Sequence, residues 1–109
     1  MDYQPNQGDI IYLDFNPQAG HEQKGRRPAL IISNGQYHQR TQMAIVCPIT
    51  NSNRAFPLHI ELSTDTETTG VIMCEQIRSI DYRVRCAAFK EKAPEDLVSQ
   101  VLQIVGLFF

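Results

Sequence analysis

Residues 8–33 read GDIIYLDFNPQAGHEQKGRRPALIIS, and this stretch decides how the chain folds. It begins and ends with short runs rich in β-branched and aromatic residues, 10–15 and 29–33, which are typical of β-strands. Residues 16–26, between the two runs, contain glycines and a proline and follow neither the strand period nor the helical period. We therefore expect two strands joined by a long polar loop, the kind of loop that often carries function in small domains.

The middle of the chain continues the pattern of short strands. Apolar or alternating runs predict further strands over 43–50, 58–62, 71–74 and 82–89. Pro48 suggests that the strand over 43–50 lies at a sheet edge or ends in a bulge. Asn34-Gly35 predicts a turn, and the polar residues 36–42 fit either one helical turn or a loop.

The last segment has a helical period instead. Apolar residues recur from Leu97 to Phe108 at helical spacing, Pro94 suits a first helical position, and two acids follow it. The apolar end of this helix, which includes Phe109, belongs either to the core or to a contact between two copies. The prediction is one mainly β domain over residues 1–109, a barrel-like sheet of about six strands with a C-terminal α-helix.

Composition places the chain among globular proteins. Its 109 residues are 42% hydrophobic, and no apolar run reaches the roughly 18–20 residues needed to cross a bilayer. Residues 1–5 lack the basic and apolar regions of a signal peptide, so we expect a soluble, cytoplasmic protein with no membrane partner. Cys47, Cys74 and Cys86 fit no zinc or redox spacing and are expected to be reduced, buried thiols.

Charge argues against a protein that coats DNA, because the net charge is −2. The charges are unevenly distributed, however. Residues 17–60 carry five cations against one acid, and residues 82–92 carry four cations against one acid. These cationic blocks either form a local anion site or are simply solvated.

Common catalytic motifs are absent from the sequence. It contains no phosphate-binding loop, no dinucleotide fingerprint and no nucleophile elbow. His21, His38 and His59 are not spaced as metal ligands, and the alternation over 58–62 places His59 on the outward side of its strand. We therefore expect no metal and no cofactor.

One group of polar residues does indicate chemistry. Pro28 fixes its own backbone angle and holds Arg27 extended at the mouth of a predicted strand. A guanidinium fixed in this way matches phosphate oxygens, and the Thr50 hydroxyl stands at the end of another strand. Together they could bind and polarise a phosphodiester. The alternative is that Arg27 only pairs with Glu22 and that Thr50 only starts a turn.

The order of these motifs resembles the MazF/PemK (Kid, ChpB) toxins of bacterial toxin–antitoxin systems. The resemblance spans nearly the whole chain and rests on GDIIYLDFNP (8–17), GHEQKGRRPALIIS (20–33), VCPIT (46–50), PL (57–58), GVI (70–72) and EQIRSID (75–81). It implies an SH3-like barrel of the CcdB/MazF type that works as a homodimer. It also implies a metal-independent endoribonuclease that cuts single-stranded RNA, chiefly messenger RNA, at short sequences, leaving a 2′,3′-cyclic phosphate and a 5′-hydroxyl.

The resemblance further implies a set of site residues. Arg27 matches the catalytic arginine of the family, and Thr50 matches its catalytic threonine. His21 and Glu75 are expected as catalytic helpers, although Met73 stands where Kid-like members have an arginine that acts with such a histidine and acid. The residues expected to bind RNA are Glu22, Gln23, Lys24, Gly25, Asn51, Ser52, Asn53, Arg54 and Gln76.

A cognate MazE-like antitoxin is the partner that the resemblance implies, and operator DNA would be bound only through the toxin–antitoxin complex. Two alternatives stay open. A CcdB-like barrel would act on a protein target such as gyrase without cutting RNA, although the intact Glu-Gln-x-Gly-x-Arg-Pro signature argues against it. A degenerate homologue would bind only an antitoxin and DNA, and purified protein that folds, dimerises and cuts nothing would support it.

Overall fold

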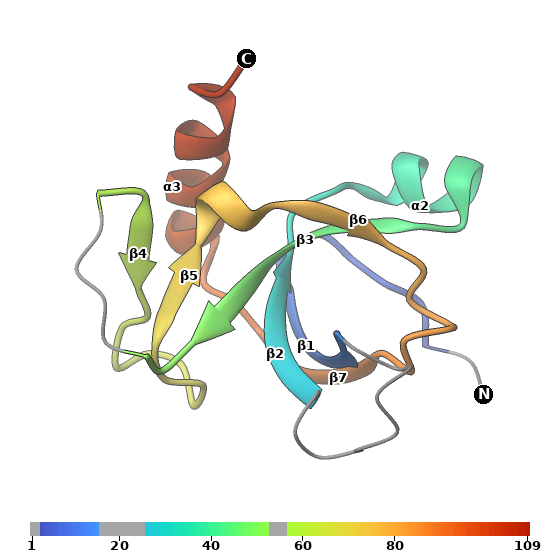
Figure 1. Cartoon of the computed structure of the whole chain (residues 1–109), viewed down its shortest axis with the longest axis horizontal. Helices are drawn as coiled ribbons and strands as arrows, with labels where there is room; N and C mark the ends of the chain where they lie inside the picture. The colour runs from blue at the N-terminus through green and yellow to red at the C-terminus, as the bar shows by residue number, and fades with distance from the viewer. Residues whose placement is uncertain (1–2, 16–25, 53–56) are drawn as a thin grey trace.

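The structure, a computed structural model, describes residues 3–15, 26–52 and 57–109 (Figure 1). Within these residues one antiparallel sheet contains β1 (Asp9–Asp14), β2 (Arg26–Ile31), β3 (Ala44–Thr50), β4 (His59–Glu61), β5 (Val71–Met73), β6 (Arg78–Ile80) and β7 (Ala88–Lys92). The helices are α2 (Gly35–Thr41), the 3-10 turn η2 (Cys74–Gln76) and α3 (Glu95–Gly106). The chain is mainly β with a C-terminal helix, as predicted. Of the two alternatives for residues 36–42, the helical one is confirmed by α2, between β2 and β3.

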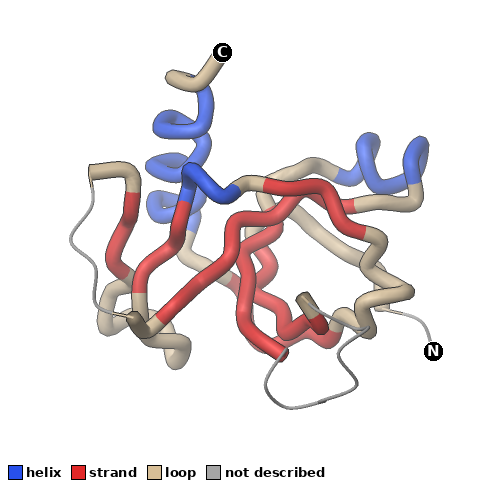
Figure 2. Tube along the Cα trace, viewed as in Figure 1, coloured by secondary structure: helices blue, strands red, loops and turns tan. Residues whose placement is uncertain are grey.

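The sheet curls around on itself rather than lying flat, as the red strands of Figure 2 show. Its strands run in the order β4-β5-β3-β2-β1-β7, and β6 also pairs with β3. β3 divides the sheet, because its first half pairs with β6 and its last two residues pair with β5. The edge formed by β4 and β5 stands beside α3 (Figure 1).

The two faces of the sheet bury different clusters, because side chains alternate across each strand. One face packs against α3, and its cluster consists of Ile10, Leu30, Ile32, Cys47, Ile49, Leu62, Ile72, Cys74, Ala93, Leu97, Val101 and Val105. On the other face, a second cluster consists of Ile11, Leu13, Ala29, Ile31, Ala44, Val46, Ile80 and Tyr82. The terminal helix therefore contributes to the core, while Leu102 on the helix and Leu107, Phe108 and Phe109 after it remain exposed.

Of the two alternatives for Pro48, a sheet edge or a bulge, the sheet edge is wrong. β3 is an interior strand, with β2 on one side and β5 and β6 on the other. The carbonyl oxygen of Ile45 accepts a hydrogen bond from the N–H of Ile32 in the segment after β2, so Pro48, at the alternate position, faces the opposite side. There, pairing with β6 ends at Val46 and pairing with β5 begins at Ile49. Proline is tolerated at this position because the missing N–H would point between β6 and β5, where neither strand needs it as a donor.

Three element boundaries also differ from those predicted. β2 begins at Arg26, inside the predicted loop, and residues 16–25 of that loop lie outside the described residues. Asn34 caps α2 by accepting the N–H of Tyr37 at 3.1 Å, so Asn34-Gly35 starts a helix rather than a simple turn. Pro94 is the cap residue before α3, with extended backbone, and not its first helical residue.

The strand predicted over 82–89 is wrong in its first part. Residues 82–86 form a turn, and β7 begins only at Ala88. The Asp81 carboxylate accepts the N–H groups of Arg83 at 3.0 Å and Val84 at 3.1 Å. This local capping by an aspartate outweighs the β-propensity of the residues that follow it.

Two of the three cysteines are buried as predicted. Cys47 and Cys74 are free and buried, whereas Cys86 is free but exposed, contrary to the expectation. A hydrogen bond with Cys74, together with burial, raises the pKa of the Cys47 thiol. Cys47 is therefore a protonated, unreactive core residue.

Buried His38 makes the stability depend on pH. Its ring nitrogens contact Ser33 Oγ at 2.6 Å and the carbonyl oxygen of Pro5 at 3.2 Å. Burial lowers its pKa below the ordinary value of 6.5. As the pH falls through 6.5, the unfolded chain takes up a proton that the folded chain does not. The free energy of unfolding should then decrease, by at most about 1.4 kcal/mol per pH unit.

Urea unfolding at about pH 7.5 and pH 5.5, on either side of the ordinary histidine pKa, measures this decrease. The variant His38→Gln keeps groups that can bond Ser33 and Pro5 but does not titrate. We expect it to lose less stability than the wild type over the same interval, since the other histidines are unchanged. Equal losses in the two proteins would show that His38 does not carry the effect.

Candidate active site

Arg27 and Thr50 are brought together by the pairing of β2 with β3. The register sets Ala29 against Pro48, and continuing it by two residues sets Arg27 against Thr50. Opposed residues of neighbouring strands share a face, which here is the face of the second cluster. Both residues line one open pocket of about 440 Å³, together with Arg26, Pro28, Ile49, Asn51 and Ser52.

Arg26 and Arg27 both line this pocket, but they differ in their partners. Arg26 donates to Asp14 Oδ1 at 3.1 Å and to the carbonyl oxygen of Cys86 at 2.9 Å, so it ties β2 to β1 and to the turn before β7. The exposed guanidinium of Arg27 makes no hydrogen bond or ion pair with any residue of the described part. Glu22, its alternative partner, lies outside that part. Arg27 is therefore suited to bind an anion.

The Thr50 hydroxyl is oriented by its own turn. Its Oγ1 accepts the N–H of Ser52 at 3.1 Å, which leaves the hydroxyl proton available to a ligand. Gly70 lies against the backbone of Thr50 with a φ of +115°, and a Cβ on it would stand 2.4 Å from the Thr50 carbonyl oxygen. Only glycine permits this approach. The start of β5 therefore fixes the end of β3 at the pocket.

Two predicted RNA-binding residues stand beside Thr50. Asn51 and Ser52 are exposed and line the pocket. The Asn51 side chain is held in place, since its Oδ1 accepts the hydroxyl of Thr69 at 3.0 Å. The segment after β3 thus offers an amide and a hydroxyl at the rim of the site.

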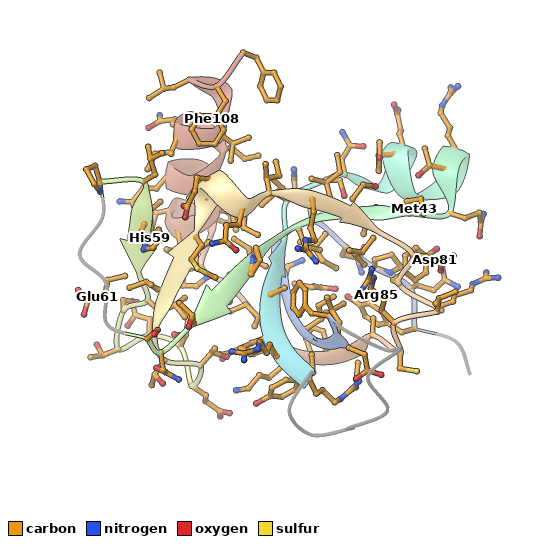
Figure 3. All side chains as sticks on the ribbon, in the orientation of Figure 1. Met43, His59, Glu61, Asp81, Arg85 and Phe108 are labelled. Carbon is orange, nitrogen blue, oxygen red and sulfur yellow. The ribbon has the colours of Figure 1, made fainter. Side chains whose placement is uncertain are left out.

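Glu75 pairs with His59. It is not among the described residues that line the pocket. His59 Nε2 and Glu75 Oε2 are 3.0 Å apart, and Glu75 Oε1 is buried without a hydrogen-bond partner among the described residues. The His59 side chain is only 6% exposed, so the outward position predicted for it is wrong. β4 pairs His59 with Met73, on the face that carries Thr50 (Figure 3 labels His59 and, on the same strand, Glu61).

The remaining predicted residues are placed only in part. Gln76 is exposed in η2, directly after Glu75. The others lie outside the described residues: His21, Glu22, Gln23, Lys24, Gly25, Asn53 and Arg54. In the ranges that are described, no three His, Cys, Asp or Glu side chains gather into a possible metal site. No helix in those ranges is long and apolar enough to cross a membrane.

Sequence analysis missed the structural roles of Gly70, Thr69 and His59. Gly70 carried a usable signal, because a glycine at the start of an apolar run often marks a close approach of two backbones. Thr69 and His59 carried none, since their contacts with Asn51 and Glu75 depend on how distant segments meet.

Comparisons with known sequences point to one family. A family model described as PemK-like, MazF-like toxin of type II toxin–antitoxin system matches residues 6–109. The endoribonuclease toxin MazF of Escherichia coli K12 is 40% identical over 96 residues, which are 87% of this chain and 86% of that protein. The endoribonuclease PemK of Escherichia coli is 36% identical over 99 residues, 87% of this chain and 74% of that protein.

Comparisons with solved structures agree. MazF of Deinococcus radiodurans (Form-I) matches with a TM-score of 0.86 and 37% identity, over 98% of this chain and 97% of that chain. MazE–MazF (Form-II) of the same organism matches with a TM-score of 0.84 and 31% identity, over 98% and 96% of the two chains. These likenesses confirm the predicted barrel of the CcdB/MazF type. The chain therefore belongs to the PemK-like, MazF-like toxin family of type II toxin–antitoxin systems.

Proposed function

We propose that the chain is an endoribonuclease that cuts single-stranded RNA by attack of the RNA's own 2′-hydroxyl. The observation that carries this proposal is that Arg27 and Thr50 line one open pocket from neighbouring strands. Relatives named as endoribonucleases, at 36% and 40% identity, support the class of reaction. Such a reaction needs no nucleophile from the protein, but it needs orientation, proton transfer and stabilisation of charge.

In this reaction the 2′-oxygen bonds to the adjacent phosphorus while the bond to the 5′-oxygen breaks. One proton leaves the 2′-hydroxyl and one reaches the departing oxygen, so the products are a 2′,3′-cyclic phosphate and a 5′-hydroxyl. Negative charge grows on the nonbridging oxygens in the transition state. We assign Arg27 to bind that charge and the Thr50 hydroxyl to donate a hydrogen bond to one of these oxygens. Arg27 is not assigned as the base, because a guanidinium in a protein holds its proton too tightly to act as one.

The remaining roles are proposed for residues around this centre. His21 and Glu75 would assist proton transfer, and the position of Glu75 beside the face that carries Thr50 supports its part. Asn51 and Ser52 would contact RNA from the pocket rim. The other residues proposed to border the RNA are Glu22, Gln23, Lys24, Gly25, Asn53, Arg54 and Gln76.

A chimeric oligonucleotide tests the identity of the nucleophile. In an RNA that the chain cuts at one bond, the 2′-hydroxyl of the nucleotide on the 5′ side of that bond is replaced by hydrogen. We expect no cleavage, because the attacking oxygen is gone. The same replacement one nucleotide further along should leave the cut intact. Cutting of the first substrate at the original bond would contradict the proposal.

Thr50→Val is expected to lower kcat by about 10²-fold, because valine keeps the β-branched shape but donates no hydrogen bond to the phosphate. Single-turnover cleavage of the same oligonucleotide measures the effect. Thr50→Ser restores a hydroxyl at this position and should recover most of the rate. If the serine variant is as slow as the valine variant, the hydroxyl does not contribute as proposed.

We further propose that the toxin is a cytoplasmic homodimer neutralised by a cognate MazE-like antitoxin, with operator DNA bound only by their complex. The likeness to MazE–MazF of Deinococcus radiodurans supports such a partner. Exposed apolar side chains on α3 and directly after it support an interface with another chain: Leu102, Leu107, Phe108 and Phe109. Light scattering on the purified chain should give the mass of a dimer, and a monomer at all concentrations would overturn this part.

A further inference from the structure

A second pocket adjoins the one that holds Arg27 and Thr50. It encloses about 370 Å³ and is lined by Thr50, Asn51, Ser52, Glu61, Leu62, Ser63, Thr64, Thr66, Thr69, Gly70 and Val71. Residues 50–52 line both pockets. A group bound in the second pocket would therefore contact the same segment as a phosphate bound in the first.

The sheet register gives the direction from one pocket to the other. Thr50 pairs with Val71, and Val71 pairs with Glu61, so a row that starts at Arg27 crosses four strands on one face. Neighbouring strands lie about 4.8 Å apart, which puts the Cα atom of Glu61 roughly 10 Å from that of Thr50. A base attached to the nucleotide beside the cut can span such a distance. Figure 3 labels Glu61 at this edge of the sheet.

The two pockets have opposite charge. Arg26 and Arg27 line the first pocket, and because Arg26 is paired with Asp14, the charge there that no described residue pairs is that of Arg27. Glu61 is the only ionisable one among the described residues that line the second pocket. A carboxylate repels phosphate and accepts hydrogen bonds from N–H groups. Around it, hydroxyl side chains offer further polar contacts, and Leu62 and Val71 offer apolar surface. This combination suits a nucleobase better than a phosphate.

Hydrogen bonds to Glu91, a residue outside the second pocket, hold the turn that forms this pocket. Glu91 on β7 accepts the N–H of Glu67 at 3.1 Å, and it accepts the N–H and the hydroxyl of Thr68 at 2.7 and 2.6 Å. Burial raises the pKa of Glu91, but these hydrogen bonds and the charge of Lys90 outweigh burial, so the pKa is lowered and the carboxylate stays ionised. A pocket whose walls are rigid before the ligand binds can discriminate between ligands of different shape.

We propose that this second pocket binds the base of the nucleotide next to the scissile phosphate, and that Glu61 selects guanine there. The inference rests on the proposed RNA cleavage. Guanine presents two adjacent donors, N1–H and N2–H, which match the two oxygens of one carboxylate. Uracil presents one N–H between two carbonyl oxygens that the carboxylate repels. Adenine and cytosine present one amino group each and should bind with intermediate strength.

Cleavage of an RNA library with random bases around the cut tests the selection. For Glu61→Gln we expect cutting to continue, while the preference for guanine at one flanking position falls about tenfold. Glu67→Gln is the matched control: it removes the same charge from the same turn outside the pocket, so its base preferences should equal those of the wild type. Unchanged preferences in Glu61→Gln would overturn the inference while leaving the proposed cleavage in place.

A binding measurement tests the preference of the second pocket for guanine independently of cleavage. A short oligonucleotide without 2′-hydroxyls, and therefore not cleavable, carries guanine or uracil at the flanking position. With guanine, we expect the NMR signals of Thr69 and Val71 to shift in the wild type and to shift less in Glu61→Gln. Should the wild type cut no RNA, the proposed function fails, but this titration still tests the pocket. Equal shifts with guanine and uracil would overturn the selection.

Discussion

Arg27→Ala should lower the rate of RNA cleavage by at least about 10³-fold and leave the fold intact. The guanidinium is the charge in the pocket that no described residue neutralises, so its loss leaves the growing charge of the transition state unpaired. The side chain is exposed, so the substitution creates no cavity and should change the free energy of unfolding little. Single-turnover cleavage and urea unfolding measure the two effects on one preparation.

Two further variants make this prediction specific. Arg40→Ala removes an identical charge from the exposed last turn of α2 and should cleave at the rate of the wild type. Arg27→Lys keeps the charge but loses the planar fork, so an intermediate rate is expected. Cleavage by Arg27→Ala at the rate of Arg40→Ala would refute the assignment of Arg27 to the reaction.

Gly70→Ala should destabilise the fold by at least about 2 kcal/mol and should reduce cleavage as well. The new Cβ would meet the Thr50 carbonyl oxygen at 2.4 Å, and alanine does not adopt a φ of +115° without strain. Relief of the clash must move β5 away from the end of β3, which displaces the Thr50 hydroxyl from the pocket. Urea unfolding and cleavage rates check both consequences.

Gly106→Ala is the matched control for this substitution. A Cβ at Gly106 meets no heavy atom within 4 Å, and the residue is helical, so alanine should leave stability unchanged or raise it slightly. If Gly70→Ala were as stable and as active as Gly106→Ala, the close approach of β5 to Thr50 would not be what fixes the site.

Local pattern was sufficient to predict most elements of the fold. The runs at 10–15 and 29–33 are strands because their β-branched residues fit a pleated, buried surface, and α3 forms where the apolar period changes to that of a helix. The prediction failed where a single side chain sets the backbone. Asp81 caps a turn over residues predicted to be strand, and Asn34 caps a helix at a predicted turn.

Pairing between distant strands was beyond the reach of the sequence. Pro48 looked like an edge residue because nothing local reveals that β3 changes partners from β6 to β5 beside it. His59 looked outward because an alternating strand does not reveal that Glu75 covers it. The position of Arg27 before Pro28 and of Thr50 at a strand end made them candidates, and the family resemblance gave them catalytic roles. Their shared pocket depends on the register of β2 with β3.

The most direct test of the account is cleavage of a long single-stranded RNA by the purified chain in excess EDTA, with both ends of every cut mapped. The account predicts discrete cuts at one short sequence, each with a 2′,3′-cyclic phosphate and a 5′-hydroxyl, and no cuts by Arg27→Ala. A folded dimer that leaves the RNA intact would contradict it and favour a protein target or an antitoxin-only role. Cuts that require a divalent metal and leave 5′-phosphates would contradict it equally.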